Sequence, residues 1–227
     1  MKLTAGLLSL GCLIALSAPA SAQIKNSTHD FSTKTWNFRA EICRVCHVPH
    51  DHDYTTKRGL VSGLLWNHAL SSATYTMYTS PSLDGAIDSA PTGTSKLCLG
   101  CHDGTVALDA FDKNPDNWVG SYLGGSARVP GSNYWSGSTG DLRATHPISI
   151  VYDETKDKGL APKTTTFGGS GTIADVLEGG TKVQCSTCHD VHNEAGEAVP
   201  GTHLLRIAQT TAQGGTASGL CLTCHVK

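Results

Sequence analysis

Eight cysteines of this chain form four Cys-x-x-Cys pairs, and a histidine directly follows each pair. Two thiols at this spacing lie on one face of a helical turn, where they reach the two vinyl groups on one edge of a haem, and the next residue can present its imidazole to the iron. Cys-x-x-Cys-His is the signature of c-type haem attachment. The sequence therefore predicts four covalently attached haem c groups, with the four histidines as proximal ligands. In chain order, the first to fourth motifs are Cys43, Cys46 and His47; Cys98, Cys101 and His102; Cys185, Cys188 and His189; and Cys221, Cys224 and His225.

Other uses of paired cysteines fit this pattern less well. Disulfides are the ordinary expectation for an exported protein with eight cysteines, but they do not explain the spacing. Zinc sites also use Cys-x-x-Cys, yet they do not require a histidine directly after every pair. Thioredoxin-like redox pairs occur singly near a βαβ pattern, which is absent here. Covalent haem explains all four motifs together.

Each iron accepts a second axial ligand, and histidine is the economical choice. Methionine ligation raises the haem potential, but Met77 is the one methionine outside the N-terminal segment, whereas seven of the eleven histidines lie outside the motifs. A histidine three residues after a proximal one cannot reach the far side of its own haem, so it is expected to ligate a haem packed alongside. Ligation by two histidines leaves no open iron site. The distal candidates are His29, His50, His68, His146 and His192.

Residues 1–22 have the pattern of a secretory signal peptide. Lys2 supplies the positive charge, an apolar run follows from Leu7 to Leu16, and small residues precede the expected cleavage before Gln23. The apolar run is too short to span a bilayer, which takes roughly 20 residues. We therefore expect export through the Sec route, to the outer surface or exterior or else to the periplasm. The net charge of −2, without a basic stripe, argues against a nucleic-acid partner.

The composition predicts a mostly irregular fold with short helices on the motifs and a few short strands. Aromatic residues make up 6% of the chain and glycine is abundant, so a core of side chains alone would be thin for this length. We expect residues 23–227 to be organised around a stack of four haems and not to fold without them. A faint duplication suggests two dihaem modules, about 23–125 and 126–227, separated by a Gly-, Ser- and Pro-rich stretch.

Seven segments of the chain together resemble the tetrahaem outer-surface cytochromes of the OmcE type: THDFS, CHVPH, WNHALSSATYTMYTS, CLGCHDGTVALD, THPISIVYD, CSTCHDVH and CLTCHVK. The resemblance implies a coil-rich chain around a continuous haem stack, bis-histidine ligation, and subunits that polymerise into extracellular filaments. It also implies that a histidine of one subunit ligates a haem of the next, for which His29 on the N-terminal arm is our hypothesis. Five distal candidates for four irons leave one in surplus, and the sequence does not choose it.

The expected function is electron transfer without catalytic residues, to redox proteins or extracellular acceptors. One alternative is a monomeric periplasmic tetrahaem carrier. A less favoured alternative is a multihaem reductase of a small oxyanion, which needs an iron with an open or unusual ligand, often lysine in place of the motif histidine. All four motifs of this chain keep histidine.

Overall fold

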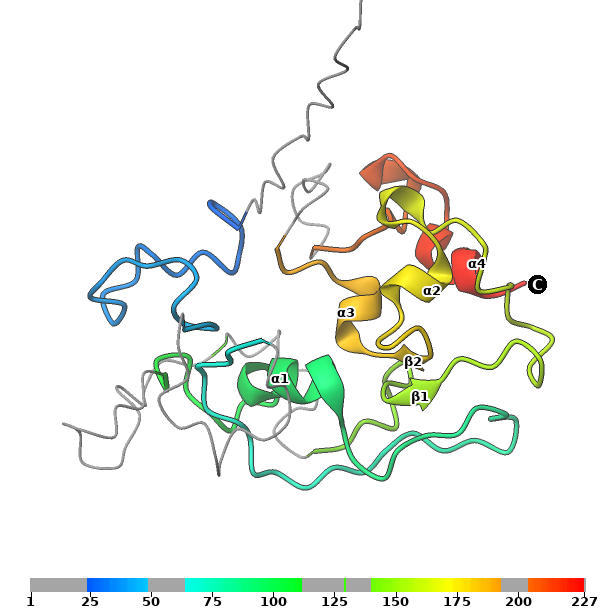
Figure 1. Ribbon diagram of the computed structural model, residues 1–227, viewed down its shortest axis with the longest axis horizontal. Coiled ribbons are helices and arrows are strands. Elements are labelled where there is room, and N and C mark those ends of the chain that lie inside the picture. The colour runs from blue at the N-terminus through cyan, green and yellow to red at the C-terminus, as the bar shows by residue number, and fades with distance from the viewer. Residues whose placement is uncertain (1–23, 49–63, 112–128, 130–139, 193–203, 227) are drawn as a thin grey trace, which may run out of the picture.

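The computed structural model describes residues 24–48, 64–111, 129, 140–192 and 204–226. Long irregular stretches connect its short elements (Figure 1), which confirms the prediction of a mostly irregular fold. None of the helices in the described residues has the length and apolar character that a membrane crossing requires. The elements are α1 (Gly93–His102), β1 (Ile150–Val151), the 3-10 helix η2 (Gly168–Ser170), α2 (Ile173–Val176), β2 (Lys182–Val183), α3 (Cys185–Cys188), the 3-10 helix η3 (Thr211–Gln213) and α4 (Gly219–Cys224).

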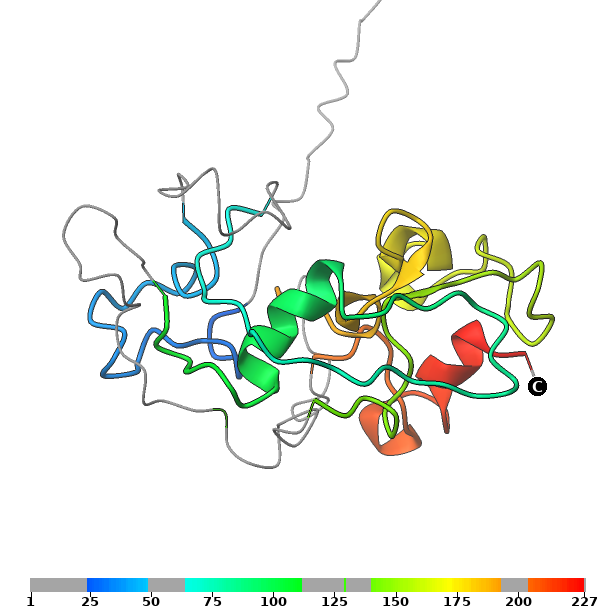
Figure 2. The ribbon, with the colours of Figure 1, turned by 90° about the horizontal axis from the view of Figure 1, so that it is seen from below.

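The two strands form one small antiparallel sheet, in which Ile150 of β1 lies opposite Val183 of β2. A segment from earlier in the chain runs along the other edge of β1, because Val151 donates its N–H to Ala86 at 2.8 Å. We call the described residues up to 111 the N-terminal half and those from 140 onward the C-terminal half. In Figure 2, α1 separates the blue N-terminal segment from the yellow and red elements of the C-terminal half.

Three of the four motifs lie on helices, as predicted: α1 carries the second, α3 the third and α4 the fourth. The first motif forms only a single turn, so the expectation of a helix there is wrong. Its turn is closed by the His47 N–H, which donates to Cys43 O at 2.8 Å. The chain then becomes extended at once, because His47 pairs with Trp66 in an isolated bridge.

The first, third and fourth motifs are clamped in the same way by a remote segment. In each, the residue after the histidine donates its N–H to that segment, and the second cysteine accepts an N–H from the residue two positions further along the same segment. This repeated arrangement holds each proximal histidine in extended backbone beyond its helical turn. The hydrogen-bonded pairs are Val48–Leu65 and Asn67–Cys46, Asp190–Leu204 and Arg206–Cys188, and Val226–Gly159 and Ala161–Cys224, at 2.8–3.0 Å.

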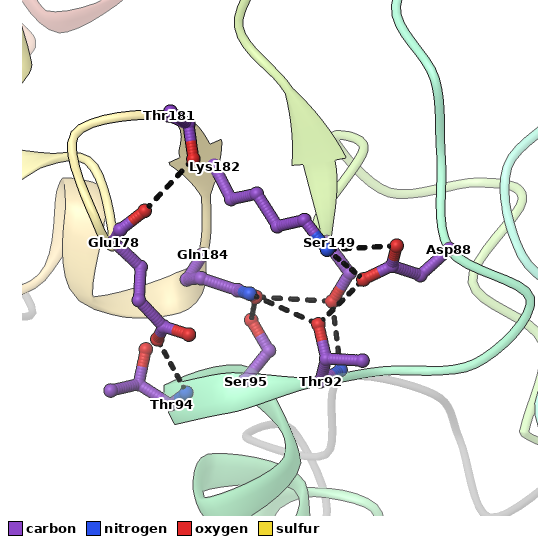
Figure 3. Close-up of polar contacts among 9 residues, drawn as sticks. All are labelled: Asp88, Thr92, Thr94, Ser95, Ser149, Glu178, Thr181, Lys182 and Gln184. Carbon is purple, nitrogen blue, oxygen red and sulfur yellow. Dashed lines mark hydrogen bonds and ion pairs between the residues drawn. The ribbon is translucent and has the colours of Figure 1, made fainter.

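A buried polar joint holds α1 against α3 (Figure 3). The side chain of Gln184, 1% exposed, accepts hydrogen bonds from Ser95 at 2.6 Å and Ser149 at 3.1 Å. Ser95 in turn accepts the backbone N–H of Cys185 at 2.9 Å. These bonds tie the helix of the second motif to the first residue of the third motif.

The start of α1 is fixed by the same joint. Glu178 accepts the Thr94 N–H at 2.9 Å, which satisfies one of the free donors at the helix N-terminus. Gly93 has a positive φ of +50°, and a Cβ there would overlap the Glu178 carboxylate. Glycine is required at this position both by its conformation and by the close approach.

Candidate haem-binding sites

Each motif places its two thiols on one helical turn, as attachment to a single haem edge requires. The backbone N–H of the following histidine donates to the first cysteine of the motif in the first, third and fourth motifs, at 2.8–3.0 Å. All eight cysteines of the motifs are free of disulfides. The thiols are therefore available for covalent attachment.

The structure pairs three proximal histidines with a second histidine from elsewhere in the chain. The ring centres are 6.1 Å apart for His29 and His102, 6.0 Å for His47 and His192, and 6.3 Å for His146 and His225. In the second of these pairs the rings are nearly parallel, with 25° between their planes. Three of the five distal candidates thus lie opposite a proximal histidine.

These separations fit two imidazoles on opposite sides of one metal. A histidine nitrogen lies about 2 Å from a bound transition metal, with the ring centre roughly 1 Å further back, so two such rings have their centres about 6 Å apart. Direct ring contact by stacking would allow shorter distances, from about 4.5 Å. Aromatic pairs without a metal also reach about 7 Å, as His29 and Phe31 do at 6.1 Å, so the separations are compatible with a metal and do not by themselves require one.

Two of the paired histidines also have the hydrogen bond that metal-ligating histidines usually make. The Nδ1 atom of His47 lies 2.5 Å from Leu64 O, and Nδ1 of His146 lies 2.9 Å from Pro147 O. A carbonyl oxygen can only accept, so Nδ1 carries the proton in each ring. Nε2 is then left with a free lone pair for a metal, and the ring orientation is fixed by the carbonyl.

His29 is partly buried, and the Nδ1 atom of its ring is itself buried. Its Nδ1 has no hydrogen-bond partner in the described part of the chain, which is unusual for a buried polar atom. Burial, followed by the neighbouring His102 and His189, lowers the pKa of His29 to about 4. The ring is therefore neutral at neutral pH, the form that binds a metal.

His68, the fifth candidate, lies in a different environment. It is 1% exposed, and its ring nitrogens lie 2.9 Å from Ala69 O and 3.0 Å from Ala107 O. Within the described residues no motif histidine lies opposite its ring, unlike the three paired candidates. Its sulfur neighbour is Cys101, with Sγ 3.5 Å from Nε2. Each nitrogen thus lies next to a backbone carbonyl, and the single N–H of the neutral ring can donate to one of them, as in a buried histidine that stabilises the fold.

The remaining candidate, His50, lies outside the described residues. Among the residues that the structure does describe, no group of three or more histidine, cysteine, aspartate or glutamate side chains is placed to hold a metal ion. A haem iron needs only two ligands from the protein. The sequence suggested that His29 ligates a haem of a neighbouring subunit. In the structure the ring of His29 lies next to the ring of His102 of the same chain, with the ring centres 6.1 Å apart.

The attachment points of the second and third motifs lie next to each other. The neighbouring Cys185 thiol, followed by burial, raises the pKa of the Cys98 thiol. The two cysteines belong to α1 and α3, the helices held together by the polar joint. Groups attached at these sulfur atoms would meet at their edges.

Sequence reasoning missed the carboxylates that follow two of the proximal histidines. Asp103 and Asp190 are 1% and 8% exposed, although aspartate is rarely buried. Burial raises the pKa of Asp103, but hydrogen bonds from Ser71, Tyr75 and Thr105 outweigh it, and the pKa is lowered overall. The signal in the sequence was the Cys-His-Asp order, present in two motifs and replaced by Cys-His-Val in the others.

The described residues fit covalently attached haem in three respects: paired thiols on one turn, histidine rings spaced for a metal, and Nδ1 atoms bound to carbonyls. A search of family models and a search of curated proteins each found no match to this chain.

Proposed function

We propose that this protein transfers electrons through four covalently attached haem c groups, each ligated by two histidines. When bound, haem c supplies an iron that gains and loses one electron. The chain itself attaches the groups through the thiols of the four motifs and fixes their axial ligands. The observation that carries the proposal is the set of three histidine ring pairs at 6.0–6.3 Å, each containing the histidine of a motif.

The geometry supports a specific assignment of the distal ligands. We assign His29 to the second motif, His192 to the first and His146 to the fourth. His50 is left for the third motif. The first and third motifs would then ligate each other's haems, because His50 follows the first motif and His192 follows the third. His68 is then the surplus histidine, with each ring nitrogen next to a backbone carbonyl.

Adjacent attachment points favour passage of electrons along the chain. The thiols of Cys98 and Cys185 are near enough for one to raise the pKa of the other, and the buried joint around Gln184 holds α1 and α3 together. With both axial positions filled by histidine, no iron would be open to a substrate. This favours an electron carrier over the reductase alternative.

Assembly into an extracellular filament is the part of the proposal that rests on the resemblance to the OmcE type. In that arrangement a histidine of one subunit ligates a haem of the next. His29 lies near the start of the described chain and meets His102. The same N-terminal arm, exchanged between copies, would carry His29 to the neighbouring subunit without new contacts.

Mass spectrometry of the exported protein tests the cofactor, and absorption spectra of two variants test the ligands. We expect four added haem masses and a fully low-spin spectrum. His29→Ala should give one high-spin haem that binds carbon monoxide, whereas His68→Gln should keep four low-spin haems. Fewer than four haems in the wild type would refute the proposed function. Electron microscopy of the secreted fraction separates filaments from a monomeric carrier.

A further inference from the structure

The residue after the proximal histidine differs among the four motifs. It is Asp103 after the second motif and Asp190 after the third, whereas it is Val48 after the first and Val226 after the fourth. Both aspartates are buried, at 1% and 8% exposure. A buried carboxylate therefore lies one residue from each of two proposed iron ligands, and none is supplied in this way at the other two.

Asp103 is surrounded by neutral donors. The hydroxyl groups of Ser71 and Tyr75 donate to its Oδ2, the latter at 2.6 Å. The N–H and hydroxyl of Thr105 both donate to Oδ1, each at 2.7 Å. Two donors on each oxygen satisfy an ionised carboxylate, which only accepts. No cationic side chain of the described residues forms an ion pair with Asp103.

Asp190 has a cationic neighbour. The guanidinium of Arg206 lies 3.9 Å from its Oδ2 and is held in place by a hydrogen bond from Arg206 Nε to Ser186 O at 2.9 Å. At a distance beyond a few ångströms, the field of this pair is largely that of a dipole. The two aspartates, although equivalent in sequence, therefore differ in the net charge that they present to a nearby metal.

A fixed charge changes the stability of the two oxidation states of a neighbouring iron by different amounts. A negative charge stabilises the oxidised iron, which carries one more positive charge than the reduced iron, and so lowers the reduction potential. Salt screens buried charges much less than exposed ones. The charge of Asp103 should therefore act on the haem of the second motif at physiological salt.

We propose that Asp103 sets the potential of the haem attached at the second motif and makes it the lowest of the four. This inference rests on the proposed function. Electrons in the protein would then reside mainly on the other three haems. An electron that passes through the haem of the second motif would have its highest energy there. Asp103 would act on the haem through its charge and would not ligate the iron. Its four hydrogen bonds fix the position of the carboxylate, one residue after the ligand histidine in the chain.

Redox titration of the holoprotein tests the proposal with two matched variants. Asp103→Asn removes the charge and keeps the shape, so the lowest of the four midpoint potentials should rise. A tenfold shift of the reduction equilibrium corresponds to about 59 mV for one electron, and we expect a shift of about that size. Tyr75→Phe removes a hydrogen bond to Asp103 but keeps its charge, and it should leave that potential at or below the wild-type value.

The outcomes separate charge from structure and from the proposed function. An unchanged lowest potential in Asp103→Asn, with four low-spin haems retained, would overturn the inference alone. So would a rise of equal size in Tyr75→Phe, because that variant keeps the charge. If Asp103→Asn does not retain four haems, an NMR redox titration of the wild type decides, since the haem at Cys98 and Cys101 must have the lowest midpoint. A wild-type protein without haem refutes the proposed function instead.

Discussion

The two halves of the described chain differ in what fills their interiors. In the C-terminal half six buried hydrophobic residues, between Tyr152 and Leu177, pack together as a conventional core. The cluster formed within the N-terminal half consists of three alanines, Ala69, Ala107 and Ala110. A third cluster joins residues of both halves around Leu99 and Leu142. Alanine buries little apolar area, so the N-terminal half has a weaker side-chain core of its own.

The segment 24–48 shows how the N-terminal half is ordered instead. Five successive turns, each closed by a hydrogen bond between residues three apart, run from Ile24 to Ala40. An aromatic row of Phe31, Trp36 and Phe111 links this segment to the rest of the half, with ring centres 5.5 and 6.1 Å apart. At the start of the row stands His29, facing His102. The segment thus contacts the second motif through His29 and contacts Phe111 through Trp36.

The largest expected effect comes from removing one haem from each half. Cys98→Ala with Cys101→Ala should leave segment 24–48 without its anchor at the second motif, so limited proteolysis should cut the N-terminal half rapidly. Cys221→Ala with Cys224→Ala should affect the C-terminal half less, because its side-chain core remains. The measurement is the rate of cleavage in each half, with fragments identified by mass.

Equal protection of segment 24–48 in the two double variants would contradict this difference between the halves. The matched control is Thr35→Ala, which changes an exposed side chain of the same segment and removes no proposed ligand. It should leave the cleavage pattern of the N-terminal segment close to that of the wild type. Haem content measured on the same samples shows that each double variant has lost one group.

The sequence predicts the parts of this arrangement that depend on local spacing. The four motifs, their helical turns and the mostly irregular chain follow from residues close together in sequence, such as Cys185 and Cys188. The pairing of histidines with motifs does not follow from local spacing, because residues far apart in the chain, such as His47 and His192, come together only in the folded structure. The choice between His29 and His68 depends on whether their nitrogens meet backbone carbonyls, which no spacing reveals.

The side-chain core of the C-terminal half can be weakened selectively at Phe167, which is fully buried. Phe167→Ala should lower the free energy of opening this half by about 3–5 kcal/mol, from lost burial and the cavity left behind. Hydrogen exchange of the amides of Ile173 and Leu177 measures it. Phe167→Leu, which keeps most of the apolar volume, should cost clearly less. Similar losses in both variants would show that this cluster does not act as a close-packed core.

The smallest expected effect concerns the rim of the joint between the halves. Asp88 in the N-terminal half forms an ion pair with Lys182 of β2, with Nζ 2.6 Å from Oδ2 (Figure 3). The pair is partly exposed, so Asp88→Asn should lower stability by at most about 1 kcal/mol. Urea unfolding at neutral pH, compared with the exposed control Asp84→Asn, measures the loss.

The pH dependence of this last effect identifies its cause. Hydrogen bonds from Lys182 and Thr92 hold the pKa of Asp88 below its ordinary value of 3.8. A carboxyl group whose pKa is lower in the folded protein contributes stability above its unfolded pKa, and this contribution disappears as the pH falls through the folded pKa. The difference between wild type and Asp88→Asn should therefore be constant from pH 7 to about pH 5 and shrink below pH 4. A difference that persists undiminished at pH 2 would indicate that the substitution disturbs packing, and that the ion pair adds nothing to the contact between the halves.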